Sequence, residues 1–211
     1  SWIEIPANNY DIAVKANLPE DDANVLALSA TLDCDQTYTI LAIGSVAQGT
    51  LKALLVENTL TPVTEGNVRA QVVHAAPNAP EVDVYVTAPD TVLSTEQPLA
   101  TLAYRASTGQ VEVPAGDYQI RITPAGSTTV VFDSGALSLE AGSDLLISAT
   151  QNVVTGSSPV SLVIATGAGS ATLLDKDTPA AIRAVHGVAD APAVDIIANN
   201  ALTLFDGAAF K

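Results

Sequence analysis

The residues of this chain that are best suited to chemistry are its two histidines, His74 and His186. Each is followed, after a stretch that contains proline, by an aspartate in an apolar run, Asp83 and Asp195. A histidine can act as a general base or bind a metal near neutral pH, and a carboxylate nearby can assist it. A turn at the prolines would let each aspartate approach its histidine. The spacing is therefore compatible with a hydrolase or a metal-dependent enzyme.

The rest of the sequence does not supply the other parts of such a site. The chain has two histidines in total, and no serine lies in a nucleophile-elbow motif. An imidazole at a strand end, hydrogen-bonded to the turn that follows it, explains the same residues without catalysis. We therefore predict a protein that is not an enzyme, with no catalytic residues, no cofactor and no metal site. The candidate binding residues are the matched polar positions around the two histidines: His74, Asn78, Asp83, His186, Asp190 and Asp195.

Asp83 and Asp195 each lie between two apolar residues of a predicted strand. Because side chains alternate between the two faces of a strand, a residue between two core residues points to solvent by default. We therefore expect both aspartates to be exposed. The alternative is an inward-facing aspartate that holds the preceding loop through backbone N–H groups.

An internal repeat covers nearly the whole chain. Residues 72–84 and 184–196 align without gaps at an offset of 112 residues and share V-H-x-x-x-[ND]-A-P-x-V-D-[VI]. Residues 3–12 and 111–120 form a second matching pair at an offset of 108 residues. Looking for such periods comes before any other reading of a fold. The chain therefore contains two copies of one module.

The two copies are cut out of phase. In residues 68–179 the V-H block comes first and the [VI]-E-[VI]-P-A block second, whereas the other copy carries these blocks in residues 180–211 and 1–67. We therefore predict one intact module and one split module. A half-module leaves sheet edges unpaired, which promotes association. The pieces should combine within one chain, as in a circular permutant, or by swapping between two copies, and we favour the first.

The composition and the turn signals predict an all-β fold. Hydrophobic residues make up 48% of the chain and aromatic residues 4%, so the apolar content is mostly aliphatic. Short β-branched runs separated by Gly, Pro, Asn and Asp are typical of sandwiches. Seven to nine strands in the intact module predict an immunoglobulin-like or transthyretin-like β-sandwich. The predicted strands are 68–75, 82–87, 99–104, 110–113, 117–124, 129–134, 137–140, 144–151 and 161–166.

The repeated motifs carry a family resemblance. V-H-x-[SA]-P-[ND]-A-P-x-V-D-V-[YF]-V, [VI]-P-A-G-x-Y-x-[IV]-x-[VIL] and T-L-x-A-G together resemble a bacterial family known as domain of unknown function 4397. The matching segments are residues 73–86, 113–122 and 137–142, with 185–197 and 5–14 in the other copy. The resemblance implies secreted or surface-attached proteins, often in tandem, with no established activity. The departures, at Asn8-Asn9 and Asp33-Cys34-Asp35, are changes in turns.

Two further features admit a binding role. Trp2 is the single tryptophan and lies near the junction of the split pieces, so we expect it to pack there; stacking on carbohydrate together with Tyr10 is the alternative. Sugar-binding faces need several exposed aromatic rings, and this chain has few. The acidic clusters at 20–22 and 175–177 lack the spacing of a calcium loop, and the sequence leaves calcium binding open.

Charge and cysteine content limit the partners and the compartment. With 8 Lys+Arg against 23 Asp+Glu, the formal charge is −15, which argues against nucleic acid. A single cysteine excludes an internal disulfide, and no apolar run is long enough to cross a membrane. We expect a secreted, periplasmic or surface protein whose targeting segment has been removed.

The predicted function is a non-enzymatic extracellular module at a bacterial surface, with a structural, adhesive or ligand-binding role. Its expected partners are a second copy of the chain, through module completion, and a surface protein or polysaccharide. The alternative is a hydrolase or metal-dependent enzyme that uses the repeated His/Asp pairs.

Overall fold

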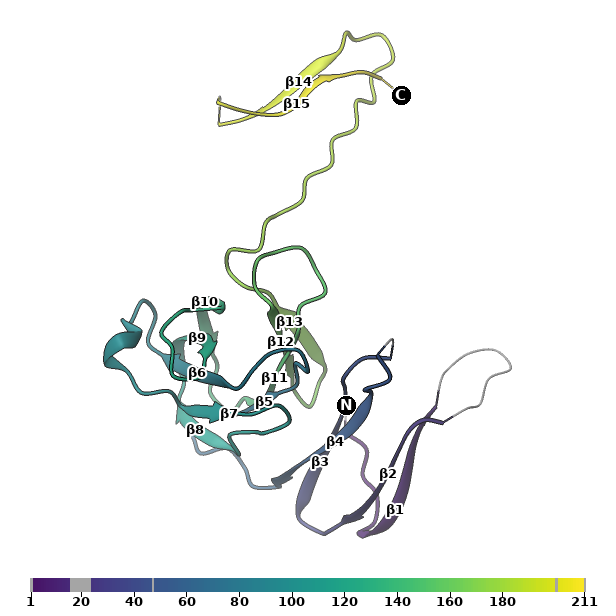
Figure 1. Ribbon diagram of the computed structural model, residues 1–211, viewed down its shortest axis with the longest axis vertical. Coiled ribbons are helices and arrows are strands. Elements are labelled where there is room, and N and C mark those ends of the chain that lie inside the picture. Colours follow the sequence, from purple (N-terminus) through teal and green to yellow (C-terminus); the bar gives the residue numbers. More distant parts are fainter. Residues whose placement is uncertain (1, 16–23, 47, 200, 211) are drawn as a thin grey trace. The chain divides into compact units, whose positions relative to one another are not determined.

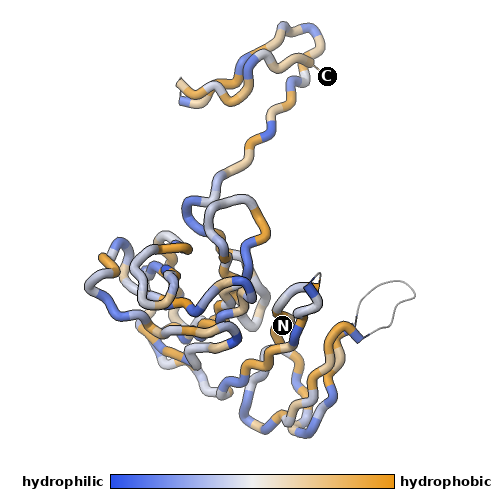
Figure 2. The backbone as a smooth tube through the Cα atoms, viewed as in Figure 1, coloured by the Kyte–Doolittle hydropathy of each residue, from blue (hydrophilic) through white to orange (hydrophobic). Residues whose placement is uncertain are grey.

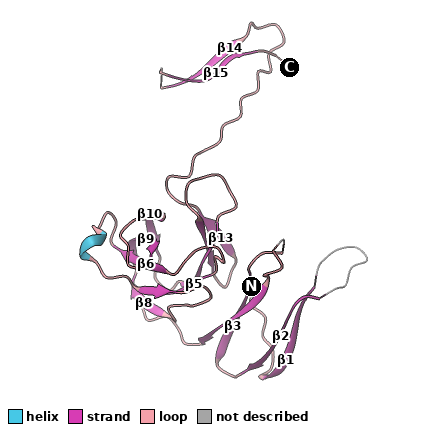
Figure 3. Ribbon diagram, in the orientation of Figure 1, coloured by secondary structure: helices cyan, strands magenta, loops and turns pink. Residues whose placement is uncertain are grey.

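The computed structural model describes residues 2–15, 24–46, 48–199 and 201–210, and these residues are organised almost entirely as β-strands (Figure 3). The one helical element among them is a 3-10 turn at Leu93–Thr95. The chain divides into two compact units, Ser1–Thr178 and Pro179–Lys211. None of the described residues forms a helix with the length and hydropathy that a membrane crossing requires. The predicted all-β class is confirmed.

Residues 67–173 form two sheets that enclose one core (Figure 1). The four-stranded sheet has the order β10 (Phe132–Leu139), β9 (Gly116–Pro124), β6 (Val82–Thr87) and β7 (Ala100–Leu102). The five-stranded sheet has the order β13 (Ser170–Leu173), β12 (Val160–Ala165), β11 (Asp144–Gln151), β5 (Asn67–His74) and β8 (Val111–Pro114). The pairing of β5 with β11 is parallel, and the other neighbours are antiparallel.

The core consists of alternate residues from the facing sides of the two sheets. Ile120 and Ile122 of β9 face Val72 of β5 and Ile147 of β11, and all four are almost fully buried. This alternation follows from the two-residue period of a strand. Phe132 of β10 fills the same cluster and is completely buried. Aliphatic side chains thus form most of the core, as the composition indicates.

The strand boundaries differ from the predicted ones at one informative place. The sequence suggested two strands, 129–134 and 137–140, but the structure has the single strand β10 with an irregularity between Asp133 and Ala136. Gly135 lies there with φ +65°, a conformation that favours glycine. A β-bulge keeps a strand continuous while it interrupts the alternation on which the prediction depended. The short strand β13 was not predicted.

Residues 2–67 contribute two hairpins to the first unit. β1 (Asn8–Lys15) pairs with β2 (Asn24–Leu32), and β3 (Gln36–Ile43) pairs with β4 (Lys52–Thr59). Figure 2 marks the apolar stretches of these hairpins in orange. The β3–β4 hairpin packs one face against the outer side of the five-stranded sheet, where a small cluster joins Val56, Val73 and Leu146.

The second unit contains one hairpin. Residues 179–193 contain no strand, and β14 (Val194–Ala198) then pairs with β15 (Leu202–Ala208). The register of this pair is interrupted twice, on either side of Ile196.

Segments that match in sequence fold alike locally. In β1–β2, Asn8 lies opposite Leu32, and in β9–β10 the matching residues Gly116 and Leu139 lie opposite each other. Each hairpin also carries the same tyrosine contact. The hydroxyl of Tyr10 donates to the carbonyl of Pro6 at 2.7 Å, and the hydroxyl of Tyr118 donates to that of Pro114 at 2.8 Å.

Candidate functional site

His74 ends β5 and is 1% exposed. Its Nε2 lies 2.9 Å from the carbonyl oxygen of Pro80, and its Nδ1 lies 3.3 Å from the backbone nitrogen of Ala76. A carbonyl can only accept, so Nε2 must carry the proton; a backbone N–H can only donate, so Nδ1 must be bare. The imidazole is therefore neutral, and both of its nitrogens are used by the turn that follows the strand.

His186 makes the same two contacts at the matching position. Its Nε2 lies 3.1 Å from the carbonyl oxygen of Pro192, and the backbone N–H of Val188 donates to Nδ1 at 3.4 Å. This imidazole is half-buried. The V-H-x-x-x-[ND]-A-P motif thus forms one local structure twice, in which histidine closes the turn.

Asp83 is buried, so the expectation that it faces solvent is wrong. Its Oδ2 accepts a hydrogen bond from the backbone N–H of Gly126 at 2.7 Å, and its Oδ1 accepts one from the hydroxyl of Thr101 at 2.5 Å. Thr101 lies on the neighbouring strand β7, and Gly126 lies in the turn after β9. The aspartate therefore has the anchoring role that was the alternative, but it holds the later β9–β10 turn rather than the preceding loop.

The structure does not join the histidines and aspartates into paired sites. His74 is bonded to the turn after β5, whereas Asp83 is bonded to Thr101 and Gly126. Asp195 is exposed, as expected, and its Oδ1 accepts from the backbone N–H of Gly207 at 2.7 Å. These carboxylates thus hold turns rather than orient an imidazole.

The two remaining candidates lie on the surface. The side-chain amide of Asn78 donates to Oε1 of Gln151 at 3.1 Å, which ties the turn after β5 to the end of β11. Asp190 lies exposed in the matching turn of the second unit. The predicted binding residues therefore mark two turns and do not converge on a shared cavity.

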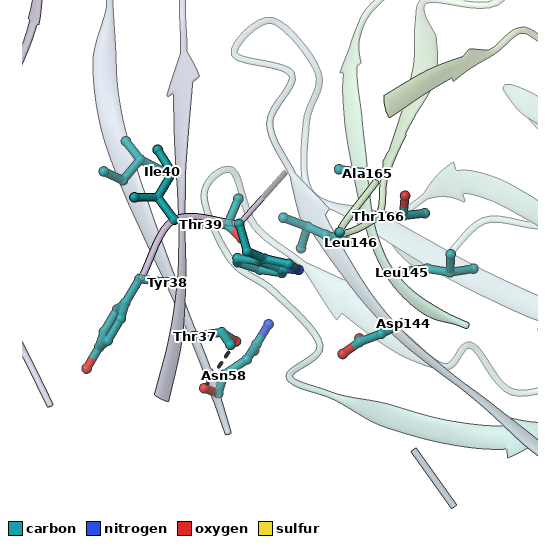
Figure 4. A pocket seen from close by; sticks show the side chains of 13 residues that line it. Thr37, Tyr38, Thr39, Ile40, Asn58, Asp144, Leu145, Leu146, Ala165 and Thr166 are labelled. Carbon is teal, nitrogen blue, oxygen red and sulfur yellow. Dashed lines mark hydrogen bonds between the residues drawn. The ribbon is translucent and has the colours of Figure 1, made fainter. Parts of the chain in front are cut away.

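A cavity of about 400 Å³ lies elsewhere in the first unit, and the sequence did not predict it. The N-terminal segment, β3, the start of β11 and the loop after β12 line it (Figure 4). Trp2 packs there against Gly167, where a Cβ atom would overlap the indole Nε1. Tyr10 lines a different, shallow depression. The pairing of Trp2 with Tyr10 for carbohydrate stacking is therefore absent, and nothing in the sequence marked Gly167 as the partner of Trp2.

A buried arginine is the main polar feature that sequence reasoning missed. Arg69 of β5 donates from Nη2 to Oδ2 of Asp144 and to the carbonyl of Thr61, both at 2.7 Å. The hydrogen bond with Asp144 raises the pKa of Arg69. The neighbouring Glu112 has a lowered pKa, chiefly because it accepts a hydrogen bond from Thr64. Arg69 thus ties the segment after β4 to the five-stranded sheet.

The acidic clusters do not assemble a metal site in the part of the chain that the structure covers. Residues 20–22 lie outside the described residues. Asp175 instead accepts from the backbone N–H groups of Asp133 and Asp177, and Lys176 pairs with Asp177 at 2.8 Å. Among the described residues, no three His, Cys, Asp or Glu side chains are grouped so that they could hold a metal ion.

Comparison with known families identifies the motifs that carry these turns. Residues 1–85 match the family model described as Domain of unknown function (DUF4397). The predicted family resemblance is therefore confirmed over this part of the chain. The matched residues include the β1–β2 hairpin with Tyr10 and the turn that His74 closes. No curated protein sequence matches the chain significantly.

Proposed function

We propose that this chain is a non-enzymatic, extracellular bacterial protein built from two immunoglobulin-like β-sandwich modules, with a structural, adhesive or ligand-binding role at the cell surface. The observation that carries the proposal is the bonding of the His74 imidazole. Both nitrogens are used by backbone groups and the ring is buried. The ring therefore offers a substrate neither a lone pair nor a proton, and His186 repeats the same bonds.

The module architecture supports the structural part of the proposal. Residues 67–173 have nine strands in two sheets around one core, which fits an immunoglobulin-like or transthyretin-like sandwich. Residues 2–59 and 179–208 carry the matching motifs, the matching hairpin register and the matching tyrosine and histidine contacts. Modules in tandem suit a spacer or an adhesive stalk, because each brings its own core.

The charge of the chain supports the proposed location. A formal charge of −15 keeps a protein soluble and separated from its neighbours, and it disfavours docking to anionic lipid or nucleic acid. A surface protein or a polysaccharide is the partner class that remains.

Catalysis can be tested on the full chain with the variant His186→Ala, because His186 is the more accessible histidine. We expect no hydrolysis of chromogenic ester, phosphoester or glycoside substrates by the wild type, and no stoichiometric transition metal by elemental mass spectrometry. A turnover or a bound metal that the variant loses would overturn the proposal. For the location, an added protease should remove the protein from intact producing cells; protection of the protein until lysis would contradict a surface role.

A further inference from the structure

The sequence repeat distributes the strands of the split module over both ends of the chain. Matches at the offsets above place the counterparts of β8 to β12 in residues 3–59, and those of β5, β6 and β7 in residues 179–208. In the intact copy β5 and β6 are interior strands, because β5 lies between β11 and β8 and β6 lies between β9 and β7. The C-terminal segment therefore carries the strands that occupy the middle of each sheet.

Two strand edges in residues 2–59 correspond to these interior positions. β1 is the counterpart of β9, whose second edge is paired with β6 in the intact copy. β3 is the counterpart of β11, whose second edge is paired with β5. Within the described residues, β1 is paired with β2 alone and β3 with β4 alone. An unpaired strand edge is a template for another strand.

The apolar faces of the two copies differ in the way that missing strands would cause. Ile122 of β9 and Ile147 of β11 are each 1% exposed in the intact core, whereas their counterparts Val14 and Ile40 are each 37% exposed. The C-terminal segment shows the complementary difference. Val73 of β5 is completely buried, and its counterpart Val185 is 80% exposed.

We propose that residues 179–208 of one copy complete residues 2–59 of a second copy, and this proposal rests on the tandem-sandwich reading above. Residues 179–186 would lie parallel to β3, and β14 would lie antiparallel to β1. Two copies that exchange these segments close both sets of edges and form a two-fold dimer. The occupant follows from the intact module, where strands with the same motifs fill the same positions. Closure within one chain, the arrangement favoured from the sequence, is the competing outcome of the test.

The intact copy also gives the register. Asp83 of β6 lies opposite Thr123 of β9, and the same offsets place Asp195 opposite Lys15. The split module thus brings an acidic and a basic residue together at a position where the intact module pairs aspartate with threonine. Opposite charges on directly opposed strand residues favour pairing, and a slip of one residue would separate them.

Cysteine cross-linking of the full chain tests the partner and the register together. In a Cys34→Ser background, Ala13→Cys is made in one chain and Ile197→Cys in another, because Tyr85 and Arg121, their counterparts, lie opposite each other. The two variants are unfolded, mixed, refolded and oxidised. We expect a disulfide-linked heterodimer on a non-reducing gel, and light scattering of the wild type should give twice the chain mass of 21.5 kDa.

Two controls make the result specific. Asp11 and Ser29 are opposite each other in β1–β2, so Asp11→Cys/Ser29→Cys in one chain should close a loop within a monomer. Ala13→Cys mixed with Ile196→Cys should link poorly, because Ile196 lies on the other face of β14.

Two results would overturn the exchange. One is a wild-type monomer whose Ala13→Cys/Ile197→Cys double variant closes within one chain, which would establish intramolecular completion. The other is the absence of any link while circular dichroism shows native strand content. Neither result produces turnover or a bound metal, so failure of the exchange is distinguishable from failure of the proposed function.

Discussion

Replacement of His74 by alanine should destabilise the intact module strongly. The substitution removes a ring that is 1% exposed, together with its two bonds to the turn after β5. The carbonyl of Pro80 and the N–H of Ala76 then lose their side-chain partner. The ring also packs edge-on against Tyr104, with centroids 6.0 Å apart, so a cavity forms beside that tyrosine.

These contributions set the size of the effect. Each buried group that loses its hydrogen-bond partner costs about 1 kcal/mol or more. The cavity adds about 2 kcal/mol, as for other large buried side chains that are cut back to alanine. The expected loss in the free energy of unfolding is therefore about 4 kcal/mol, and the melting temperature should fall by about 10 °C for a unit of this size.

Urea unfolding followed by far-UV circular dichroism measures this loss, and hydrogen exchange can assign it to the peptides of β5 and β11. His74→Gln is a matched control, because its amide nitrogen can still donate to the carbonyl of Pro80; we expect about half the loss. His186→Ala removes the same two bonds at a half-buried position. In dilute solution, its cost should be under about 1 kcal/mol.

A loss below about 1 kcal/mol for His74→Ala would refute the structural role of this residue. The same would follow if His74→Gln were as destabilising as His74→Ala, because the bond to Pro80 would then contribute nothing. A cost for His186→Ala that increases with protein concentration would instead be expected from the strand exchange, which buries that ring.

Three further substitutions test separate contacts. Asp83→Asn places an N–H group against that of Gly126 or the hydroxyl of Thr101, and thermal melting should show a loss of about 2 kcal/mol; an unchanged melting temperature would mean that the carboxylate does not hold the turn. Tyr118→Phe removes the hydroxyl bond to Pro114 and should cost about 1 kcal/mol in urea unfolding, with no change if water replaces the bond. Glu112→Gln tests a lowered pKa: the stability that the carboxylate contributes is present above its ordinary pKa of 4.5 and lost as the pH falls through the lower folded value. The wild type and this variant should therefore differ in urea midpoint at pH 7 and converge in acid, and a constant difference would contradict the assignment.

Local patterns were sufficient for most of the strands. The predicted bounds of β6 and β11 agree with the structure, because both are short apolar runs between turn residues. The bulge in β10 was missed, because a glycine at positive φ shifts the alternation without ending the strand. The strand β13 was missed because Ser170–Leu173 is short and mostly exposed.

The polar residues were harder to place than the strands. Alternation assigned Asp83 correctly to the side of β6 away from the core, but it cannot tell whether that side is covered. Thr101 on β7 and the turn at Gly126 come from other parts of the chain, and they bury the carboxylate. The contact between Trp2 and Gly167 is equally long-range.

The sequence by itself determined the all-β class, most strands of residues 67–173, the repeated turn motifs and the family resemblance, because all of these depend on residues close together in the chain. Only the tertiary structure decided which polar groups are buried, how the histidine nitrogens are bonded and where the cavity beside Trp2 lies. These properties depend on which distant segment covers a given face, and a strand's two-residue period contains no information about that segment.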